Sequence, residues 1–308
     1  MVDESADYSV ETVYEGLDRP TALAVRRWNS DEAPHEFFIA ESGSGTVRQV
    51  LSSEPPQVSK AVEGLSEGGP LAVVLTTRTR LLVGTRGGAS NFLLPRDATT
   101  LRAGEPGQPA SIAAVDSAAA DFYGLVLAEG PARVFAVVQT GGSGAVLLGQ
   151  VSGNRVERFG TLTSESLRRP RGVALSPSGR PRFVVVADSG GDEPADSSLH
   201  FYKPHSGELV LSLPVPLDEL CGVAYSPRGE LYAVNGASRA EGGGVYRLDE
   251  VLEGGRQSCQ PALLALLTRP TDLVFGPDGL PYAIATGELD GNESGPTGAL
   301  YRVSGDFE

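Results

Sequence analysis

The fold of this chain is decided by the stretch Pro170-Arg171-Gly172-Val173-Ala174-Leu175, which recurs in altered form along most of the sequence. Each copy places a small or polar pair before a short apolar run. The copies begin at Pro20, Pro70, Phe122, Pro170, Leu220 and Pro270, at intervals of 50, 52, 48, 50 and 50 residues. Regular recurrence of this kind indicates one structural unit used repeatedly.

A turn and a second apolar run follow each copy. The turns are clearest at Ser176-Pro177-Ser178-Gly179 and its counterparts Ser226-Pro227-Arg228-Gly229 and Gly276-Pro277-Asp278-Gly279. Proline presets φ and glycine accepts positive φ, so these segments reverse the chain. The second runs, such as Val184-Val185-Val186-Ala187, are short and rich in β-branched residues, which favours buried strands over helices. A third strand in most units and a weaker fourth strand complete the unit.

Four antiparallel strands per unit, in six units, predict an all-β fold, the six-bladed β-propeller. We expect residues 1–308 to form a single domain, with blades that start near residues 19, 69, 121, 169, 219 and 269. The sixth unit ends without a fourth strand. We therefore expect residues 7–15 to complete the last blade, which closes the ring and removes exposed sheet edges. Blade two is the poorest copy, and its outer part at residues 102–107 is expected to be a loop.

The charge composition limits which classes of binding partner are expected. The 308 residues include 25 Lys and Arg against 39 Asp and Glu, a formal net charge of −14. Nucleic-acid binding requires clustered positive charge, so we expect no nucleic-acid partner. No segment approaches the roughly 18 consecutive apolar residues of a membrane span. We expect no membrane span, and a monomer.

The compartment stays open. Residues 1–7 have neither the basic region nor the apolar core of a signal peptide. The protein is then cytoplasmic, or periplasmic or extracellular if a leader was removed. Cys221 and Cys259 fall on different strands of one unit, and two cysteines in a chain this long are weak evidence for a disulfide. Whether these two residues interact stays open as well.

Parts of the repeat resemble known families. The stretch Val185-Val186-Ala187-Asp188-Ser189, with the preceding residues 171–179, resembles an NHL-type propeller repeat. The last blade, residues 270–279 and 297–301, is similar to repeats of ScyD/ScyE-like propellers. A more distant likeness extends to gluconolactonase-like, strictosidine-synthase-like and sugar-dehydrogenase propellers. The resemblance covers most of the chain but is carried by structural residues, so it implies the fold and hardly any chemistry.

Two classes of position are expected at the mouth of the central channel, where propellers usually place their sites. The first class is an arginine directly before a proline, at Arg19, Arg169 and Arg269. The second class ends the second strand of each blade, at Glu41, Thr85, Gln139, Asp188, Asn235 and Thr286. Asp272 would add a carboxylate near the axis, because the other copies carry Ala or Gly at that position.

These residues suggest two chemistries and one structural alternative. The candidate metal ligands are Glu41, Asp188 and the loop residue Asp290, because carboxylate oxygens suit Ca²⁺. The candidate ligand-binding residues are Arg19, Arg169, Arg269, Asp272, Gln139 and Asn235, and the guanidinium forks are suited to an anion. Alternatively, the polar residues cap the turn that leaves their own strand. Recurrence blade by blade favours this structural alternative.

Catalytic groups are scarce. None of His35, His200 and His205 aligns with the channel positions, so a histidine-based centre is poorly supported. We therefore expect a non-catalytic propeller that binds a protein, a glycan or a small ligand at the channel mouth. The alternative is a Ca²⁺-dependent hydrolase of the lactonase type, with the metal in the channel. A quinone-dependent sugar dehydrogenase is a distant third.

Overall fold

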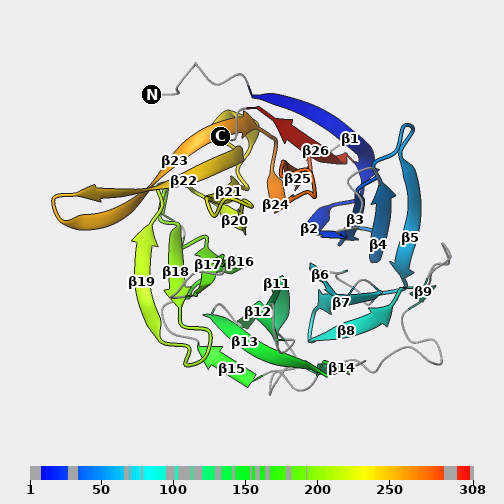
Figure 1. The fold of residues 1–308 in the computed structure, drawn as a ribbon, viewed down its shortest axis with the longest axis horizontal. Helices are drawn as coiled ribbons and strands as arrows, with labels where there is room; N and C mark the ends of the chain where they lie inside the picture. The colour runs from blue at the N-terminus through cyan, green and yellow to red at the C-terminus, as the bar shows by residue number, and fades with distance from the viewer. Residues whose placement is uncertain are drawn as a thin grey trace.

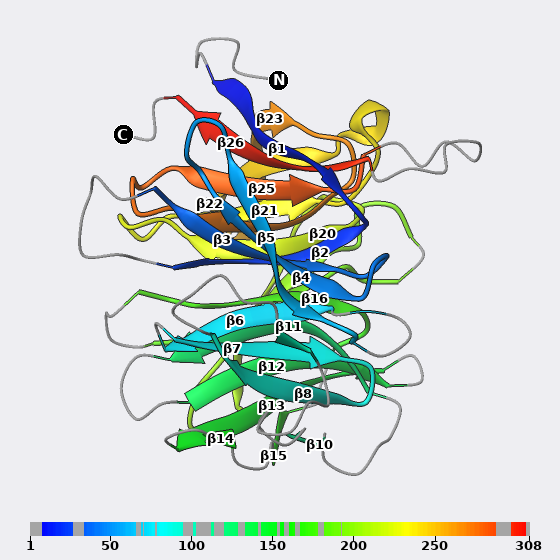
Figure 2. The same cartoon turned by 90° about the vertical axis from the view of Figure 1, so that its right-hand side faces the viewer.

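The computed structural model describes residues 8–26, 34–65, 69, 71–77, 79–94, 101–102, 112–113, 120–128, 133–140, 143–152, 155–156, 160–163, 167–177, 182–191, 193–287 and 297–305. Their strands form six sheets, antiparallel except for one short parallel pair, arranged as a ring around a central channel (Figure 1). The side view shows the strands of successive blades stacked around this ring (Figure 2). The prediction of an all-β, six-bladed propeller is confirmed.

Each blade is built outward from the channel. The innermost strands are β2 (Pro20–Arg26), β6 (Ala72–Thr77), β11 (Asp121–Ala128), β16 (Pro170–Leu175), β20 (Leu220–Tyr225) and β24 (Pro270–Phe275). The second strands are β3 (Glu36–Glu41), β7 (Arg80–Thr85), β12 (Arg133–Thr140), β17 (Val184–Asp188), β21 (Leu231–Asn235) and β25 (Pro281–Ala285). The third strands are β4 (Thr46–Leu51), β8 (Gly88–Leu93), β13 (Ser143–Ser152), β18 (Ser198–Tyr202), β22 (Gly244–Glu253) and β26 (Gly298–Ser304).

The outer strands close the blades and the ring. They are β5 (Gln57–Glu63), β10 (Ile112–Ala113), β14 (Arg155–Val156), β15 (Gly160–Thr163), β19 (Leu209–Pro214), β23 (Arg256–Leu266) and β1 (Ser9–Leu17). Strand β1 pairs antiparallel with β26, from Ser9 opposite Ser304 to Leu17 opposite Gly298. The first described strand is thus the outermost strand of the last blade, as expected from residues 7–15, although β1 extends two residues further.

Blade two departs from the simple repeat. Leu101 and Arg102 form β9, which pairs in parallel with β5 and so adds a fifth strand to blade one. The expectation that the segment beginning at residue 102 is a loop is therefore wrong for Arg102, and residues 103–111 lie outside the described residues. The outer strand of blade two is β10. Blade three also has five strands, because β14 and β15 both pair with β13.

The turn chemistry acts as the sequence predicts. Gly229 and Gly279 have φ of 94° and 79°, a region that L-residues with side chains rarely adopt. The Gly229 amide donates to the Ser226 carbonyl, and the Gly279 amide donates to the Gly276 carbonyl. These bonds close the turn between the first and second strands of blades five and six.

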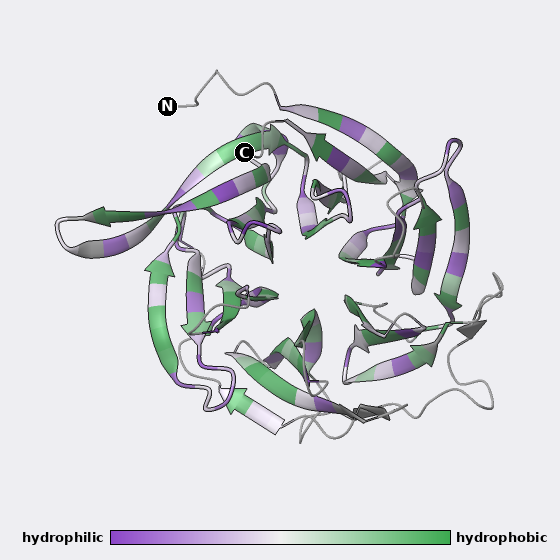
Figure 3. Cartoon of the chain, viewed as in Figure 1, coloured by the Kyte–Doolittle hydropathy of each residue, from purple (hydrophilic) through white to green (hydrophobic). Residues whose placement is uncertain are grey.

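The hydrophobic core lies between the blades. The described residues form six buried clusters, and each cluster joins two neighbouring blades. The cluster between blades six and one contains Leu17, Phe37 and Tyr282, so burial as well as pairing holds the two chain ends together. Outer strands such as β1 and β5 alternate between hydrophobic and hydrophilic residues, as expected for one solvated face (Figure 3). Among the described residues, no helix has the length and apolar character that crossing a membrane requires.

Candidate functional site

One position of the repeat points a side chain from every blade into the channel mouth. In five blades the register of the innermost strand shifts against its neighbour at this point, so that the innermost strand holds one extra residue, for example Arg171 between Pro170 and Gly172. Such β-bulges redirect a side chain and are common beside functional sites. The six residues at this position, called the neck ring below, are Thr21, Leu71, Tyr123, Arg171, Cys221 and Thr271.

The neck ring forms the floor of a cavity of about 720 Å³ at the channel mouth. The charged residues that line this cavity are Arg169, Arg171, Arg269, Glu193, Asp218, Glu219 and Glu241. Below the ring, a second cavity of about 510 Å³ follows the channel between the innermost strands. Thr21, Tyr123, Arg171 and Thr271 line both cavities, so the two spaces meet at the neck ring.

Arg171 is the cation of the neck ring. Its guanidinium carbon lies 4.2 Å from the centre of the Tyr123 ring, a cation–π contact between blades four and three. This stacking holds the planar donor fork in place at little further entropic cost. No carboxylate among the described residues forms an ion pair with Arg171. Arg171 lines the cavity, so its guanidinium is available to a ligand there.

Asp272 lies just inside the ring, in the channel wall. Its Oδ2 accepts a hydrogen bond from the Leu23 amide of blade one, and its Oδ1 accepts one from the Leu273 amide, both at 2.9 Å. Burial raises the pKa of the carboxyl group to about 7, although both hydrogen bonds oppose the shift. At Gly222, in the neighbouring blade, an added Cβ would lie 2.6 Å from Oδ1. The glycine therefore makes room for the carboxyl group.

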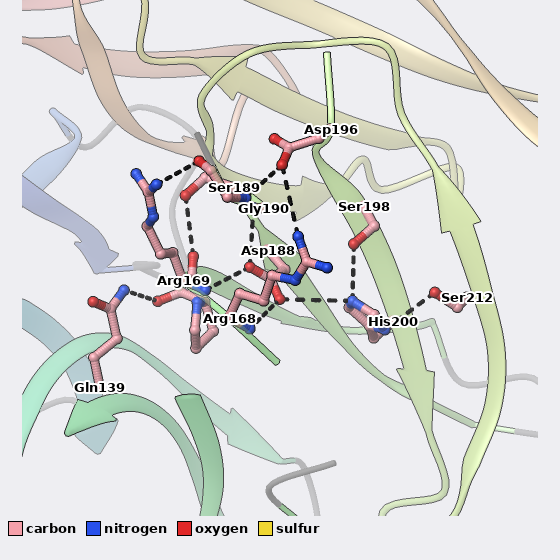
Figure 4. Close-up of polar contacts among 12 residues, drawn as sticks. Gln139, Arg168, Arg169, Asp188, Ser189, Gly190, Asp196, Ser198, His200 and Ser212 are labelled. Atoms are coloured by element: carbon pink, nitrogen blue, oxygen red, sulfur yellow. Dashed lines mark hydrogen bonds and ion pairs between the residues drawn. The ribbon is translucent and has the colours of Figure 1, made fainter. Parts of the chain in front are cut away.

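Asp188 acts as a backbone cap. It is buried at the end of β17, and its carboxylate accepts hydrogen bonds from the amides of Arg168 and Arg169 at 2.7 Å each and from Gly190 at 3.1 Å. Figure 4 shows these bonds converging on one side chain. On its outer side lies His200, whose Nε2 is 3.8 Å from Oδ2. Burial lowers the pKa of His200, and the charge of Asp188 opposes that shift.

Glu41 and Asn235 occupy the same place in blades one and five. Glu41 is fully buried and accepts bonds from the Asp18 amide, from Thr46 and from both arms of the Arg48 guanidinium. Asn235 accepts from the Glu219 amide and donates to the Gly242 carbonyl. Neither side chain lines either cavity. All three strand-end residues therefore satisfy buried groups of their own blade, as in the structural alternative.

The structure also corrects the alignment of this class. Glu41, Asp188 and Asn235 pair with the first residue of their innermost strand. In blade three Val138 pairs with Phe122 and in blade six Ala285 pairs with Pro270. Phe122 and Pro270 are the first residues of the repeat in these blades, so Gln139, which pairs with Asp121, and Thr286, which follows Ala285, stand one residue beyond the equivalent of Asp188. Gln139 donates instead to the Pro170 carbonyl of blade four.

The three Arg-Pro arginines differ in position. Arg169 and Arg269 line the mouth cavity, whereas Arg19 does not. Arg19 is exposed and lies 3.8 Å from Asp18. Arg169 donates to the Gly191 carbonyl at 2.5 Å. The backbone carbonyls of all three arginines accept an equivalent hydrogen bond. The amide donors are those of Ser42 to Arg19, Ser189 to Arg169 and Thr286 to Arg269.

The predicted Ca²⁺ site at Glu41, Asp188 and Asp290 stays a prediction. The described residues contain no group of three or more His, Cys, Asp or Glu side chains placed to hold a metal. Glu41 and Asp188 lie on different blades, and their oxygens already accept the hydrogen bonds described above. Asp290, the third candidate ligand, lies outside the described residues.

Sequence reasoning missed the neck ring. Arg171, Tyr123 and Cys221 all lie in the quoted repeat, directly after its first residue. The signal was available as the most variable position of the repeat, at which the blades carry Thr, Leu, Tyr, Arg, Cys and Thr. Burial raises the pKa of the Cys221 thiol to about 11, so it is a neutral member of the ring. The two cysteines are not joined.

Comparison with known proteins gives the fold and little more. No protein-family model matches the sequence, and no curated protein matches it. Among solved structures, the chain is similar to a gluconolactonase from Xanthomonas campestris, with 14% identity, a TM-score of 0.62 and coverage of 97% of this chain and 90% of that chain. It is equally similar to the PQQ-bound aldose sugar dehydrogenase of Streptomyces coelicolor, with 16% identity, a TM-score of 0.62 and coverage of 97% and 99%. The WD40 propeller domain of Doa1 follows at 13% identity and a TM-score of 0.55, with 98% of each chain covered. At such identities the likeness is one of architecture.

Proposed function

We propose that this protein is a binding propeller that takes a small ligand in the mouth cavity, on the neck ring. One observation carries the proposal. The strand-end residues Glu41, Asp188 and Asn235 repeat one capping role in three blades, whereas the neck ring carries five residue types in six blades and opens into a cavity. A device that supports the fold is expected to repeat, and a site that recognises an asymmetric molecule is not.

The size and lining of the cavity favour a small molecule over a protein surface or a long glycan. Pockets for small molecules have volumes of about 300–1,000 Å³ and combine apolar walls with a few fixed polar groups. The mouth cavity has about 720 Å³, with Leu71, Tyr123 and Cys221 beside Arg171 and the threonines. Arg169 and Arg269 are proposed as further binding groups at its rim. Asp272, Gln139 and Asn235 are proposed to support the site indirectly, through their hydrogen bonds to backbone groups.

The test fills the mouth cavity with a bulky side chain and leaves its charged residues unchanged. Leu71→Trp adds bulk to the neck ring at a half-buried position, and Val10→Trp adds the same residue type to the exposed outermost strand β1. Ligand-observed NMR with a fragment library is run on the wild type and both variants. We expect fragments that bind the wild type to lose binding in Leu71→Trp and to keep it in Val10→Trp. Equal binding to all three proteins would place the site elsewhere.

The second candidate is a Ca²⁺-dependent hydrolase of the lactonase type. The similarity to a gluconolactonase structure favours it at the level of the fold. Its metal would need donors beyond Glu41 and Asp188, whose oxygens are engaged. Calorimetric titration of chelator-treated protein with Ca²⁺, followed by an assay of lactone hydrolysis, separates the two candidates. Stoichiometric Ca²⁺ binding that Glu41→Gln and Asp188→Asn abolish, with hydrolysis, would favour the hydrolase. Membership of the NHL-type propellers stays a proposal that rests on the repeat pattern alone.

A further inference from the structure

The charged residues of the mouth cavity come from neighbouring blades. Among the described lining residues, blades one, two and three contribute Thr21, Leu71 and Tyr123, which carry no charge. Blades four, five and six contribute three arginines and four carboxylates, namely Arg169, Arg171, Arg269, Glu193, Asp218, Glu219 and Glu241. The charged half of the cavity therefore holds both signs, and its carboxylates outnumber its arginines.

Several of these charged groups already have a partner. Arg169 donates to a backbone carbonyl, and Asp218 accepts a backbone amide at 2.8 Å. Glu241 accepts a hydrogen bond from the Ser238 hydroxyl at 2.7 Å. That bond lowers the pKa of Glu241, and the charge of Arg269 adds to the shift. These groups are therefore less available to a ligand.

Arg171 and Glu219 are the two charged groups nearest the neck ring by sequence. Arg171 belongs to the ring and stacks on Tyr123, and Glu219 lies two residues before the ring member Cys221. Within the described part of the chain, no carboxylate forms an ion pair with Arg171 and no cation forms one with Glu219. The remaining carboxylate, Glu193, is an exposed residue of the loop between β17 and β18.

Gly236 keeps a space open beside Glu219. A Cβ added at Gly236 would lie 2.7 Å from Cys221 Sγ, 3.2 Å from Glu219 Oε2 and 3.4 Å from the Pro270 carbonyl oxygen. All four residues line the mouth cavity. The φ of Gly236 is not positive, so the backbone conformation alone does not require a glycine here. Two oxygen acceptors at the edge of this space suit the several N–H donors of an ammonium group.

The guanidinium of Arg171 and the space at Gly236 are close neighbours. Strands β16 and β20 approach so closely that a Cβ added at Gly172 would overlap the Cys221 carbonyl. Burial raises the pKa of the Cys221 thiol, the charge of Arg171 opposes that shift, and the charge of Glu219 adds to it. Both charges therefore act on the same thiol. A small ligand that contacts both needs its own two charges only a few bonds apart.

We propose that the ligand is an α-amino acid, whose carboxylate pairs with Arg171 and whose ammonium group enters the space beside Gly236 to meet Glu219. A carboxylate matches the guanidinium fork in a bidentate way. The excess of carboxylates in the lining favours such a zwitterion over a simple anion. The uncharged half of the cavity, on blades one to three, is left for the side chain. The inference rests on the proposed function, since it names the class of ligand that the mouth cavity takes.

The experiment is a calorimetric titration at pH 7 with each of the common L-amino acids. The one that binds most tightly is then compared with its amide, which loses the carboxylate, and with the deaminated acid, which loses the ammonium group. We expect the amide to bind roughly 10- to 100-fold more weakly, because one charge-assisted pair is lost. The deaminated acid should bind roughly tenfold more weakly, because Glu219 is exposed and its charge is screened. The homologous β-amino acid, with its charges further apart, should also bind more weakly.

Two variants assign each charge of the ligand to a residue. Arg171→Gln should weaken the amino acid by roughly 10- to 100-fold and leave its amide unchanged. Glu219→Gln should weaken the amino acid by roughly tenfold and leave the deaminated acid unchanged. Glu208→Gln, the same exchange at the exposed ion pair with Lys203, should change nothing.

A third variant fills the ammonium space and alters no charge. Gly236→Ala should weaken the amino acid and leave the deaminated acid unchanged, because the methyl group takes the place of the ammonium group. Gly160→Ala, with open space around it, is the matched control. Thermal unfolding of both variants checks that the fold is kept.

The outcomes separate this inference from the proposed function. Equal binding of the amino acid and the deaminated acid, with no effect of Glu219→Gln, would overturn the ammonium site. Equal binding of the amino acid and its amide, with no effect of Arg171→Gln, would overturn the carboxylate site. If no amino acid binds but Leu71→Trp still abolishes fragment binding, the ligand class is wrong and the binding site is right. If Leu71→Trp has no effect either, both proposals fall.

Discussion

Replacing Asp188 by Asn tests whether the strand-end residues cap the backbone or serve a site. The carboxylate is buried and accepts three backbone amides, those of Arg168, Arg169 and Gly190. Asparagine has nearly the same shape, so the exchange leaves no cavity. It replaces one acceptor oxygen by an NH₂ group that faces amide donors.

The cost follows from these bonds. A hydrogen bond to a charged group contributes about 1.5–3 kcal/mol, and a buried donor left without an acceptor costs about 1–3 kcal/mol. Because one amide loses its charged acceptor, the free energy of unfolding falls by about 3 kcal/mol. At roughly 2 °C per kcal/mol for a long chain, Tm should fall by about 6 °C.

The assay is thermal unfolding followed by circular dichroism, with urea unfolding as a second measure. Glu208→Gln is the control, because it removes the same charge from the same blade at an exposed ion pair with Lys203. Such pairs contribute about 0–1 kcal/mol, so Tm should hardly change. If Asp188→Asn melts within about 1 °C of the wild type while ligand binding is lost, the capping role is wrong. The residue would then belong to a binding site.

Three further predictions concern the channel. Because the pKa of Asp272 is raised, the folded state holds a proton between about pH 4 and 7 that the unfolded state releases. The free energy of unfolding therefore falls as pH rises through that range, by up to about 4 kcal/mol. Urea unfolding should therefore show Asp272→Asn gaining on the wild type from pH 4 to pH 8, and a constant difference would contradict this. Gly222→Ala should destabilise by about 1–3 kcal/mol through its clash with Asp272, whereas Gly160→Ala, with open space around it, should be neutral in the same unfolding assay. Both thiols should react slowly with a disulfide reagent at pH 8, because burial raises the pKa of Cys221 and Cys259 to about 11. Cys221 should react first, because it lines the mouth cavity and is half-buried whereas Cys259 is buried, and faster reaction of Cys259 would contradict this.

Much of the architecture could be read from local sequence rules. Apolar runs bounded by Pro and Gly mark the strands, because strand burial and turn geometry act over a few residues. The interval near 50 residues then gives the number of blades. The closure of the ring by β1 was also predictable, because the sixth unit lacked an outer strand and residues 7–15 formed a strand-like segment that belonged to no unit. Strand β9 was not, because its parallel pairing with β5 depends on where a chain segment returns in space.

The candidate site was only partly predictable. Arg169 and Arg269, directly before an innermost strand, and Asp272, within one, line the cavities, and the repeat identifies all three positions. The roles of Glu41 and Asp188 were ambiguous, because a carboxylate that caps a turn and one that binds a metal look alike in a sequence. Only the positions of the amide donors distinguished them.

What the sequence by itself determined is the repeating unit, the strands and the closed ring, because these follow from short-range hydrophobic patterning and turn residues. What only the tertiary structure decided is which side chains meet at the axis. Thr21 and Arg171 are 150 positions apart in the sequence yet line the same cavity. In five blades a β-bulge at the start of the innermost strand turns the neck-ring side chain inward, and the ring geometry brings the residues of all six blades together. Neither effect leaves a trace within any single repeat.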